Sequence, residues 1–257
     1  MMEWLSEDSG ERLAQAGRLR LFLDYDGTLA DFAPTPEHVN PSHEVAELVA
    51  ALVERPHIRV AVVSGRRLSH VEALLPVPGA LLAGTYGVEL RTPAGERVER
   101  VDYDAVRPML ERIKPRWSAL IERRAGFFLE DKGWTLALHA RFADEDEAEV
   151  VLDEACSLIN HDATAELFRV LGGHKFLEIG PRLAHKGRTV SYVLDRYPWP
   201  DALPLYLGDD DKDEEAFEVI QARGGLAIRV ISQERETRAD GRLESPQSAR
   251  RWLRTLL

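Results

Sequence analysis

The stretch Arg18-Leu19-Arg20-Leu21-Phe22-Leu23-Asp24-Tyr25-Asp26-Gly27-Thr28 decides the fold of this chain. Its first half, residues 18–23, is short and mostly apolar, which is typical of a strand buried on both faces of a parallel sheet. The run stops at two aspartates spaced two residues apart, and the glycine behind them allows a tight turn. Ligands of open parallel sheets bind beyond the carboxyl ends of the strands. We therefore interpret Asp24 and Asp26 as part of a ligand site.

The same alternation of strands and helices fills the first hundred residues and returns near the C-terminus. Strands are predicted at 58–63, 80–83, 203–207 and 226–230, and helices at 45–53, 68–75, 186–194, 214–222 and from Ser245-Pro246 onward. Between these parts the order changes to helix–strand–strand, twice: helix from 104 with a bend at Pro115, strands 127–131 and 134–141, helix 144–159, strands 164–171 and 176–179 with a turn at Gly172-Gly173.

These patterns predict an α/β fold. Its core is a doubly wound, Rossmann-like parallel sheet formed by residues 1–103 and 182–257, and residues 104–181 form a smaller α+β cap inserted into it.

Composition limits the partners. The 257 residues carry a formal net charge of -11, which repels phosphate backbones, so we expect no nucleic-acid partner. No stretch approaches about 20 consecutive apolar residues, and the acidic segment 1–17 does not resemble a signal peptide, so we expect no membrane partner. The single cysteine, Cys156, lies in an apolar helical pattern and is interpreted as a small buried hydrophobe. A chain without disulfides fits a cytoplasmic protein, and we expect a monomer.

Three polar clusters follow predicted strands of the core. One acidic loop alone is more often a helix cap or a solvated turn, but three clusters at equivalent strand ends indicate one shared site. The clusters are Asp24/Asp26/Thr28, Ser64/Arg66 and Asp209/Asp210/Asp213. Five carboxylates that converge on one edge repel each other unless a cation lies among them. Hard oxygen ligands without a nearby pair of cysteines favour Mg²⁺ over zinc.

The spacing of the first two aspartates allows two roles in phosphoryl transfer. We expect Asp24 to attack phosphorus, and Asp26 to protonate the leaving oxygen and then activate water. Thr28 and Ser64 offer hydroxyls to phosphate oxygens, and Lys186 supplies a balancing positive charge at the start of a helix. The expected ligands of the cation are the Asp24 carboxylate, the Asp26 backbone carbonyl and Asp209, with Asp210 or Asp213 behind them.

Four segments resemble, in order, the four motifs of haloacid-dehalogenase-type phosphatases. They are Asp24-Tyr25-Asp26-Gly27-Thr28-Leu29, Ser64-Gly65-Arg66, Lys186-Gly187, and Gly208-Asp209-Asp210 with Asp213-Glu214. The first motif alone is a fair hypothesis, whereas four in the right order are specific. The resemblance implies an aspartyl-phosphate intermediate, Mg²⁺, and phosphate binding by Thr28, Ser64, Gly65 and Arg66. The position of the insert and its doubled order look like the large cap type of that superfamily.

Within this superfamily the chain is similar to the trehalose-6-phosphate phosphatase family over about residues 19–230. The similarity rests on Glu130-Asp131-Lys132-Gly133, His139, Arg141 and Glu178. It implies a phosphoric monoester hydrolase of carbohydrate metabolism, in trehalose biosynthesis, which converts trehalose 6-phosphate to trehalose and phosphate. It also implies sugar recognition by cap residues, namely Glu130, Lys132, His139, Arg141, Lys175 and Glu178. Three positions depart from the family pattern, which often has His at Tyr86, Tyr at Ala140 and Thr at Lys212. A lysine in the acidic loop either points outward or weakens metal binding.

The cap residues also have plainer interpretations. The strand face that carries His139 and Arg141 could be solvated, and Glu130 with Lys132 could form a surface ion pair of little value. Glu178 is the strongest candidate because an unpaired carboxylate in an apolar strand is costly.

Three alternatives to the leading function remain open. The chain could be a phosphatase for another sugar phosphate or a glycosyl-glycerate phosphate, a phosphosugar mutase, or a catalytically silent sugar-phosphate-binding module. The aspartate pair argues against the silent module, because binding alone needs no acid–base carboxylate beside a nucleophile.

Overall fold

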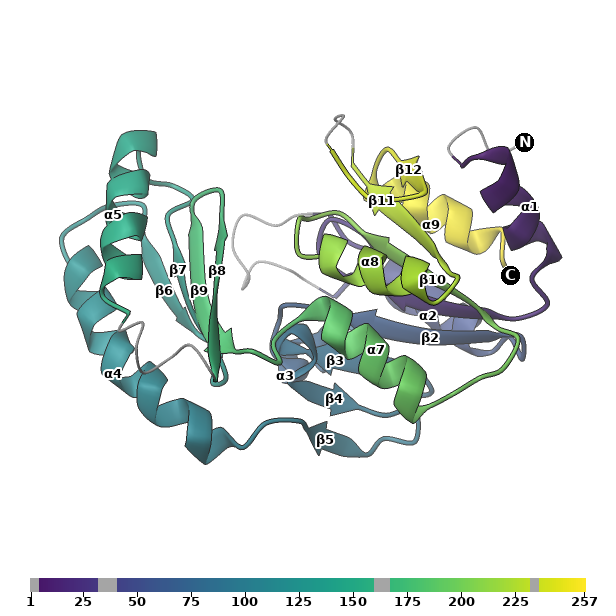
Figure 1. The fold of residues 1–257 in the computed structure, drawn as a ribbon, viewed down its shortest axis with the longest axis horizontal. Coiled ribbons are helices and arrows are strands. Elements are labelled where there is room, and N and C mark those ends of the chain that lie inside the picture. The colour runs from purple at the N-terminus through teal and green to yellow at the C-terminus, as the bar shows by residue number, and fades with distance from the viewer. Residues whose placement is uncertain (1–4, 32–40, 160–166, 232–235) are drawn as a thin grey trace. The chain divides into compact units, whose positions relative to one another are not determined.

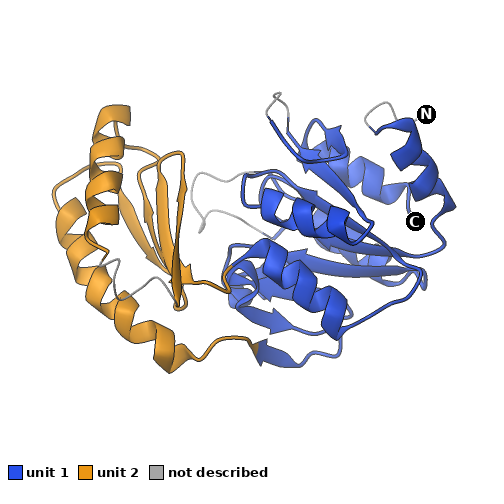
Figure 2. Ribbon diagram, in the orientation of Figure 1, with its two compact units in different colours: residues 1–98, 185–257 blue, residues 99–184 orange. Residues whose placement is uncertain are grey.

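The computed structural model describes residues 5–31, 41–159, 167–231 and 236–257, and it divides the chain into two compact units. Unit 1 comprises residues 1–98 and 185–257, and unit 2 comprises residues 99–184 (Figure 2). The sequence placed the two junctions at 103/104 and 181/182. The assignment of one unit to catalysis and the other to specificity stays a prediction.

Unit 1 is built around an eight-stranded sheet with the order β12-β11-β10-β1-β2-β3-β4-β5 (Figure 1). Its strands are β1 (Leu19–Leu23), β2 (Ile58–Val63), β3 (Leu81–Gly84), β4 (Glu89–Arg91), β5 (Arg97–Glu99), β10 (Leu203–Gly208), β11 (Leu226–Val230) and β12 (Gly241–Leu243). The strands from β12 to β3 pair in parallel, and β4 runs antiparallel to β3. Strand β1 pairs with β2 on one side and with β10 on the other. The strands that follow β1 in sequence extend the sheet in one direction, and those after β10 extend it in the opposite direction, so the topological switch point lies between β1 and β10. Doubly wound sheets bind their ligands at this point.

Helices cover both faces of this sheet. On one face α2 (His43–Val53), α3 (Leu68–Leu74) and α9 (Pro246–Arg254) share an apolar cluster with Leu21 and Leu23 of β1. On the other face α7 (Lys186–Arg196) and α8 (Glu214–Ala222) share a second cluster with Phe22. All five residues of β1 are buried, because successive side chains of a strand point to opposite faces and both faces are covered. The predicted doubly wound core is confirmed.

Unit 2 is an α+β module, as predicted. Its four strands form an antiparallel sheet in the order β6-β7-β9-β8, with β6 (Phe128–Asp131), β7 (Leu136–His139), β8 (Phe168–Gly173) and β9 (Phe176–Pro181). The helices α4 (Tyr103–Ile121) and α5 (Glu145–Ser157) pack one apolar cluster against the sheet. The Trp117 indole of α4 donates a 2.9 Å hydrogen bond to the Ala155 carbonyl of α5. Helix α4 runs through Pro108 and Pro115 as one element, and Cys156 is partly buried in α5.

Two expectations about unit 2 are wrong. The hairpin turn lies at His174-Lys175 and not at Gly172-Gly173, because both glycines remain in β8 and Lys175 takes the left-handed conformation with φ 54°. Strand β7 ends at His139 and does not reach Arg141. The chain turns there, since the Ala140 N–H bonds to the Lys175 carbonyl and the Ala143 N–H to the Ala140 carbonyl. His139 and Arg141 therefore do not share a strand face. Residues 164–166 of the predicted strand 164–171 lie outside the described residues.

The sequence patterns missed α1 (Glu7–Gln15) and β12. Ser6 caps helix α1, because its hydroxyl accepts the Ser9 N–H, and the helix buries Leu13 against the core. Within the described ranges, no helix combines the length and the apolar character needed to cross a membrane.

Candidate active site

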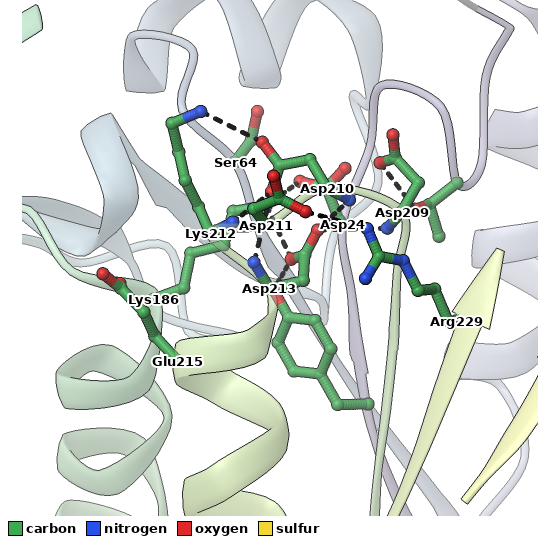
Figure 3. A network of polar contacts seen from close by, with 12 residues as sticks. Asp24, Ser64, Lys186, Asp209, Asp210, Asp211, Lys212, Asp213, Glu215 and Arg229 are labelled. Atoms are coloured by element: carbon green, nitrogen blue, oxygen red, sulfur yellow. Dashed lines mark hydrogen bonds and ion pairs between the residues drawn. The ribbon is translucent and has the colours of Figure 1, made fainter. Parts of the chain in front are cut away.

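The parallel strands bring the three polar clusters to one edge of the unit 1 sheet. Asp24 follows β1, Ser64 follows β2 and Asp209 follows β10, and β1 lies between the other two strands. Their side chains lie within one network of polar contacts (Figure 3). Asp24 and Asp209 are 185 positions apart in the sequence, and they come together only because β1 and β10 are neighbours in the sheet.

Lys186 is the only cation among the described residues that is buried between two of these aspartates. It is the first residue of α7, and its Nζ lies 2.8 Å from Asp24 Oδ1 and 2.7 Å from Asp213 Oδ1 (Figure 3). Both Asp24 and Lys186 are almost fully buried, at 5% and 3% exposure. The lysine therefore holds the Asp24 carboxylate in one position and balances part of its charge.

Asp213 organises the acidic loop after β10. Its Oδ1 accepts hydrogen bonds from Lys186 and from the Tyr206 hydroxyl, which lies 2.7 Å away. Its Oδ2 accepts the backbone N–H groups of Asp209 and Asp210, both at 3.1 Å. All lone-pair directions of this carboxylate thus have partners within the protein, so Asp213 shapes the loop that presents Asp209.

Among the described residues, the carboxylates of Asp24, Asp209 and Asp213 cluster closely enough to surround a metal ion, with Asp213 already engaged by its four donors. One carboxylate oxygen from each lies within 4.8 Å of the other two. Burial raises the pKa of Asp24 well above its usual range, and it raises the pKa of Asp209 to about 8 and of Asp213 to about 6. Burial alone would lower the pKa of Lys186, but Asp213 and Asp24 raise it well above its usual value.

The lysine is therefore charged, yet it neutralises only part of the negative charge that the loop concentrates. A metal ion fits this set of donors, because oxygen-only ligands with excess negative charge suit a hard divalent cation. Asp210 belongs to the same loop. Burial would raise its pKa, but Lys186 and Lys212 lower it below its usual range. Lys212 does not simply point outward, since its Nζ lies 3.3 Å from Asp210 Oδ2.

Asp26 is held by Arg66, which follows β2. The guanidinium makes two contacts to the carboxylate, from Nε to Oδ2 at 2.6 Å and from Nη2 to Oδ1 at 2.8 Å. Gly27 has φ 77°, which lets the chain turn directly behind Asp26. The Thr28 hydroxyl is buried and donates to Asp209 Oδ1 at 3.3 Å, so the first and fourth motifs are in direct contact.

The segment after β3 supports the Ser64-Gly65-Arg66 motif. Thr85 and Tyr86 both have left-handed backbones, with φ 49° and 57°, which is a rare and strained conformation for such residues. The Thr85 N–H bonds to the Arg66 carbonyl and the Tyr86 N–H to the Ser64 carbonyl. A Cβ on Gly65 would lie 2.8 Å from the Tyr86 ring, so any larger residue would have to displace that ring.

Sequence reasoning missed two further residues of the site. Tyr206 is fully buried and bonds to Asp213, and the signal for it was a hydroxyl-bearing residue within the apolar run before the acidic loop. Arg229 of β11 is 1% exposed and pairs with Asp211 at 3.0 Å and Glu214 at 2.7 Å. It fixes the outer side of the loop, and a charged residue in an otherwise apolar strand was the signal.

In unit 2, four of the six predicted sugar-binding residues form one polar chain. Glu178 is fully buried and accepts from Lys132 Nζ at 3.1 Å and from the Thr135 hydroxyl. Lys132 lies 4.0 Å from Glu130, which in turn lies 3.0 Å from His139 Nε2. The side chains of Lys132 and Glu130 are only 8% and 16% exposed, which argues against the alternative of an exposed surface ion pair.

The other two residues are Lys175 and Arg141. Lys175 donates to the Ala143 carbonyl at 2.7 Å and pairs with Glu145 at 3.0 Å. Arg141 is exposed beyond the end of β7. The roles assigned to all six residues stay predictions.

The doubly wound sheet, the inserted α+β unit and the lysine buried among aspartates define a protein of the haloacid-dehalogenase-like class. A family model described as trehalose-phosphatase matches residues 22–247, and the chain belongs to that family.

Curated relatives extend over most of the chain. The trehalose 6-phosphate phosphatase RA3 of Zea mays is 30% identical over 260 residues, which cover 95% of this chain and 71% of the relative. A trehalose-phosphate phosphatase of Mycobacterium avium is 34% identical over 239 residues, which cover 89% of this chain but 59% of the relative. The solved C-terminal domain of Candida albicans trehalose-6-phosphate phosphatase has a TM-score of 0.82 at 21% identity, with 96% of this chain and 94% of that chain covered. This last likeness supports the fold.

Proposed function

We propose that the chain is a Mg²⁺-dependent phosphatase that hydrolyses trehalose 6-phosphate to trehalose and phosphate. One observation carries the proposal: Asp24 is buried at the carboxyl end of the central strand, 2.8 Å from the buried ammonium of Lys186. This arrangement leaves a carboxylate in one fixed position beside a positive charge, which suits attack on a negatively charged phosphoryl group. We infer the substrate, trehalose 6-phosphate, from the membership of the chain in the trehalose-phosphatase family.

The reaction proceeds in two halves. In the first, an Asp24 oxygen forms a bond to phosphorus as the bond from phosphorus to the sugar oxygen breaks, and Asp26 gives its proton to that leaving oxygen. In the second, Asp26 takes a proton from water, whose oxygen attacks the aspartyl phosphate and releases phosphate with Asp24 restored. The two halves return both carboxyl groups to their starting states.

Arg66 links substrate binding to the acid–base residue. Its guanidinium holds both oxygens of Asp26 in the ligand-free protein. A phosphate group offers the same bidentate geometry with more negative charge, so it competes for Arg66. Transfer of Arg66 to phosphate frees Asp26 for proton transfer only when substrate is bound. Thr28, Ser64 and the Gly65 N–H complete the proposed phosphate site.

Mg²⁺ would be held by the Asp24 carboxylate, the Asp26 backbone carbonyl and Asp209. When bound, it neutralises charge on the phosphoryl oxygens during transfer. Asp210 and Asp213 position this set, Asp213 through its hydrogen bonds to the loop. The buried excess of carboxylates supports a divalent cation, and oxygen-only donors favour Mg²⁺ over softer metals.

Unit 2 supplies specificity in this proposal, through Glu178 first and then Lys132, Glu130, His139, Arg141 and Lys175. The connected polar chain from Glu178 to His139 supports the ranking, because a rigid set of donors and acceptors selects among sugar hydroxyls.

Phosphate release from a panel of phosphate esters tests the proposal. The panel contains trehalose 6-phosphate, glucose 6-phosphate, a glycosyl-glycerate phosphate and an aryl phosphate, each with and without Mg²⁺. We expect the highest kcat/KM for trehalose 6-phosphate. Equal rates for the sugar phosphates would refute the substrate but not the chemistry. A sugar phosphate isomer as product would indicate a mutase, and tight binding without turnover would indicate a silent module.

A further inference from the structure

A pocket lies in unit 1, at the amino ends of the strands whose carboxyl ends form the candidate active site. Its volume is about 420 Å³, which falls in the range of about 300–1,000 Å³ typical of small-molecule sites. Its walls come from the starts of β2 and β3 and from the end of α7, and they are mainly apolar, including Ile58, Val60, Leu81 and Val193.

Two arginines line this apolar pocket. Arg20 of β1 and Arg59 of β2 lie directly opposite each other in the parallel register of the two strands. Like charges in neighbouring strands are destabilising. Arg20 is also 6% exposed, so its charge is largely removed from water. Such a pair is a costly arrangement, because Arg20 lies in a strand whose other residues are all apolar.

The hydrogen bonds of Arg20 do not neutralise its charge. Its guanidinium donates to the carbonyl of Val193, in the last turn of α7, at 2.9 Å, and to that of Tyr197, which caps the end of this helix. A helix C-terminus provides only about half an elementary negative charge. Burial, and then the neighbouring Arg59, lower the pKa of Arg20 to about 10.

Arg59 is exposed and lies over the Trp199 ring, with its guanidinium carbon 4.3 Å from the ring centroid. In the described ranges neither arginine has a carboxylate within ion-pair distance, although the chain contains 44 acidic residues. The stacked tryptophan orients the Arg59 guanidinium, and the N–H groups of this guanidinium stay available for an anion.

We propose that this pocket binds a small organic acid, with its carboxylate on Arg59 and Arg20 and its apolar body against Ala61, Leu81 and Val193, which lie on the same face of the sheet as the two arginines. Guanidinium groups bind carboxylates through two parallel hydrogen bonds, and an anion would compensate the two adjacent positive charges. The apolar walls exclude a purely polar anion as the preferred ligand, because they would gain nothing from its burial.

Calorimetric titration of the full chain with hexanoate, hexanamide and hexylammonium tests this inference. Saturating Mg²⁺ and inorganic phosphate keep the probes away from the candidate active site. We expect one molecule of hexanoate to bind per chain, and hexanamide, which has the same shape without the charge, to bind at least about 10-fold more weakly. Hexylammonium should not bind.

Arg59→Gln is the decisive variant, because an exposed side chain can be replaced without loss of the fold. It should weaken hexanoate binding at least about 10-fold. Arg242→Gln removes the same charge from an exposed position of another strand of this sheet, β12, and should leave binding unchanged. Three outcomes would overturn the proposal: no saturable hexanoate binding up to about 10 mM, equal affinities for hexanoate and hexanamide, or equal effects of the two substitutions.

Discussion

Replacement of Lys186 by methionine probes the electrostatic balance of the candidate active site. Methionine is similar in length but has no charge, so the variant keeps the volume and loses the ammonium. In the native protein this ammonium makes two hydrogen bonds to buried carboxylates, at 2.8 Å to Asp24 and 2.7 Å to Asp213. Its removal leaves both carboxylates buried without their nearest positive charge.

The size of the effect follows from these contacts. A hydrogen bond to a charged group contributes about 1.5–3 kcal/mol, so two of them give about 3–6 kcal/mol. Breaking a buried ion pair by removing one partner costs about 3–5 kcal/mol, which agrees. We therefore expect Lys186→Met to lower the free energy of unfolding of unit 1 by about 3–5 kcal/mol at pH 8 in the presence of a chelator.

The loss should depend on pH in a definite direction. Lys186 lowers the pKa of both Asp24 and Asp213, so its removal raises these already elevated values further. A carboxyl group whose pKa is higher in the folded than in the unfolded state opposes folding increasingly as the pH rises between the two values. For Asp213 this window starts near the ordinary value of 3.8 and extends beyond about 6. The destabilisation should accordingly be smaller at pH 5 than at pH 8.

Urea denaturation followed by circular dichroism measures the loss, and hydrogen exchange of the β1 and α7 peptides assigns it to unit 1. Lys114→Met is the matched control, because Lys114 is 41% exposed in its pair with Asp131, and it should cost at most about 1 kcal/mol. Our reasoning fails if Lys186→Met lies within about 1 kcal/mol of the native protein at pH 8. A loss of equal size at pH 5 and pH 8 would show that lost packing, and not charge, is responsible.

Four further predictions concern activity, measured as phosphate release. Asp24→Asn should abolish turnover with an unchanged circular dichroism spectrum, and retention of a tenth of the native rate would exclude Asp24 as the nucleophile. Asp26→Asn should slow sugar phosphate hydrolysis by about 10²–10⁴-fold but aryl phosphate hydrolysis much less, because an aryl leaving group needs no proton; equal losses would contradict an acid–base role. Chelation should remove activity and Mg²⁺ should restore it, so full activity after exhaustive chelation would disprove metal dependence. Glu178→Ala should lower kcat/KM for trehalose 6-phosphate by about 10²-fold or more and leave the aryl phosphate rate nearly unchanged, whereas an equal effect on both would assign Glu178 to the fold of unit 2.

Most of the core fold could be predicted from the sequence because its strands are buried on both faces. Such strands appear as short apolar runs, and the boundaries of β2, β11 and α8 agree with the predicted ones. Helix α1 and strand β12 were not predicted, because neither has a strong periodic pattern of apolar residues. Each contributes only one or two buried residues, such as Leu13 and Leu243, and owes its position to contacts that are distant in sequence.

The candidate site could be predicted only in part. The residues of the polar motifs could be predicted, because each motif follows a predicted strand and ligands of a parallel sheet bind at the carboxyl ends of its strands. The pairing of Asp26 with Arg66 could not be predicted, because it joins residues 40 positions apart through side-chain geometry that no local pattern encodes. In unit 2 the buried partner of Glu178 could be inferred to exist from the cost of an unpaired carboxylate, but not identified as Lys132 and Thr135.

The position of the insertion explains how unit 2 can be present without disturbing the site. The chain leaves unit 1 at the end of β5, between Val98 and Glu99; β5 is the last strand at one edge of the sheet, and the chain returns just before α7. An insertion at an edge strand breaks no hydrogen bonds between central strands, and loop-closure entropy rises only slowly with the length inserted. The returning chain enters α7 at Lys186, so the third motif is fixed by the packing of α7 on the sheet and by its two aspartate partners. Unit 2, which we propose recognises the sugar, can therefore change in sequence while the residues proposed for phosphoryl transfer keep their geometry.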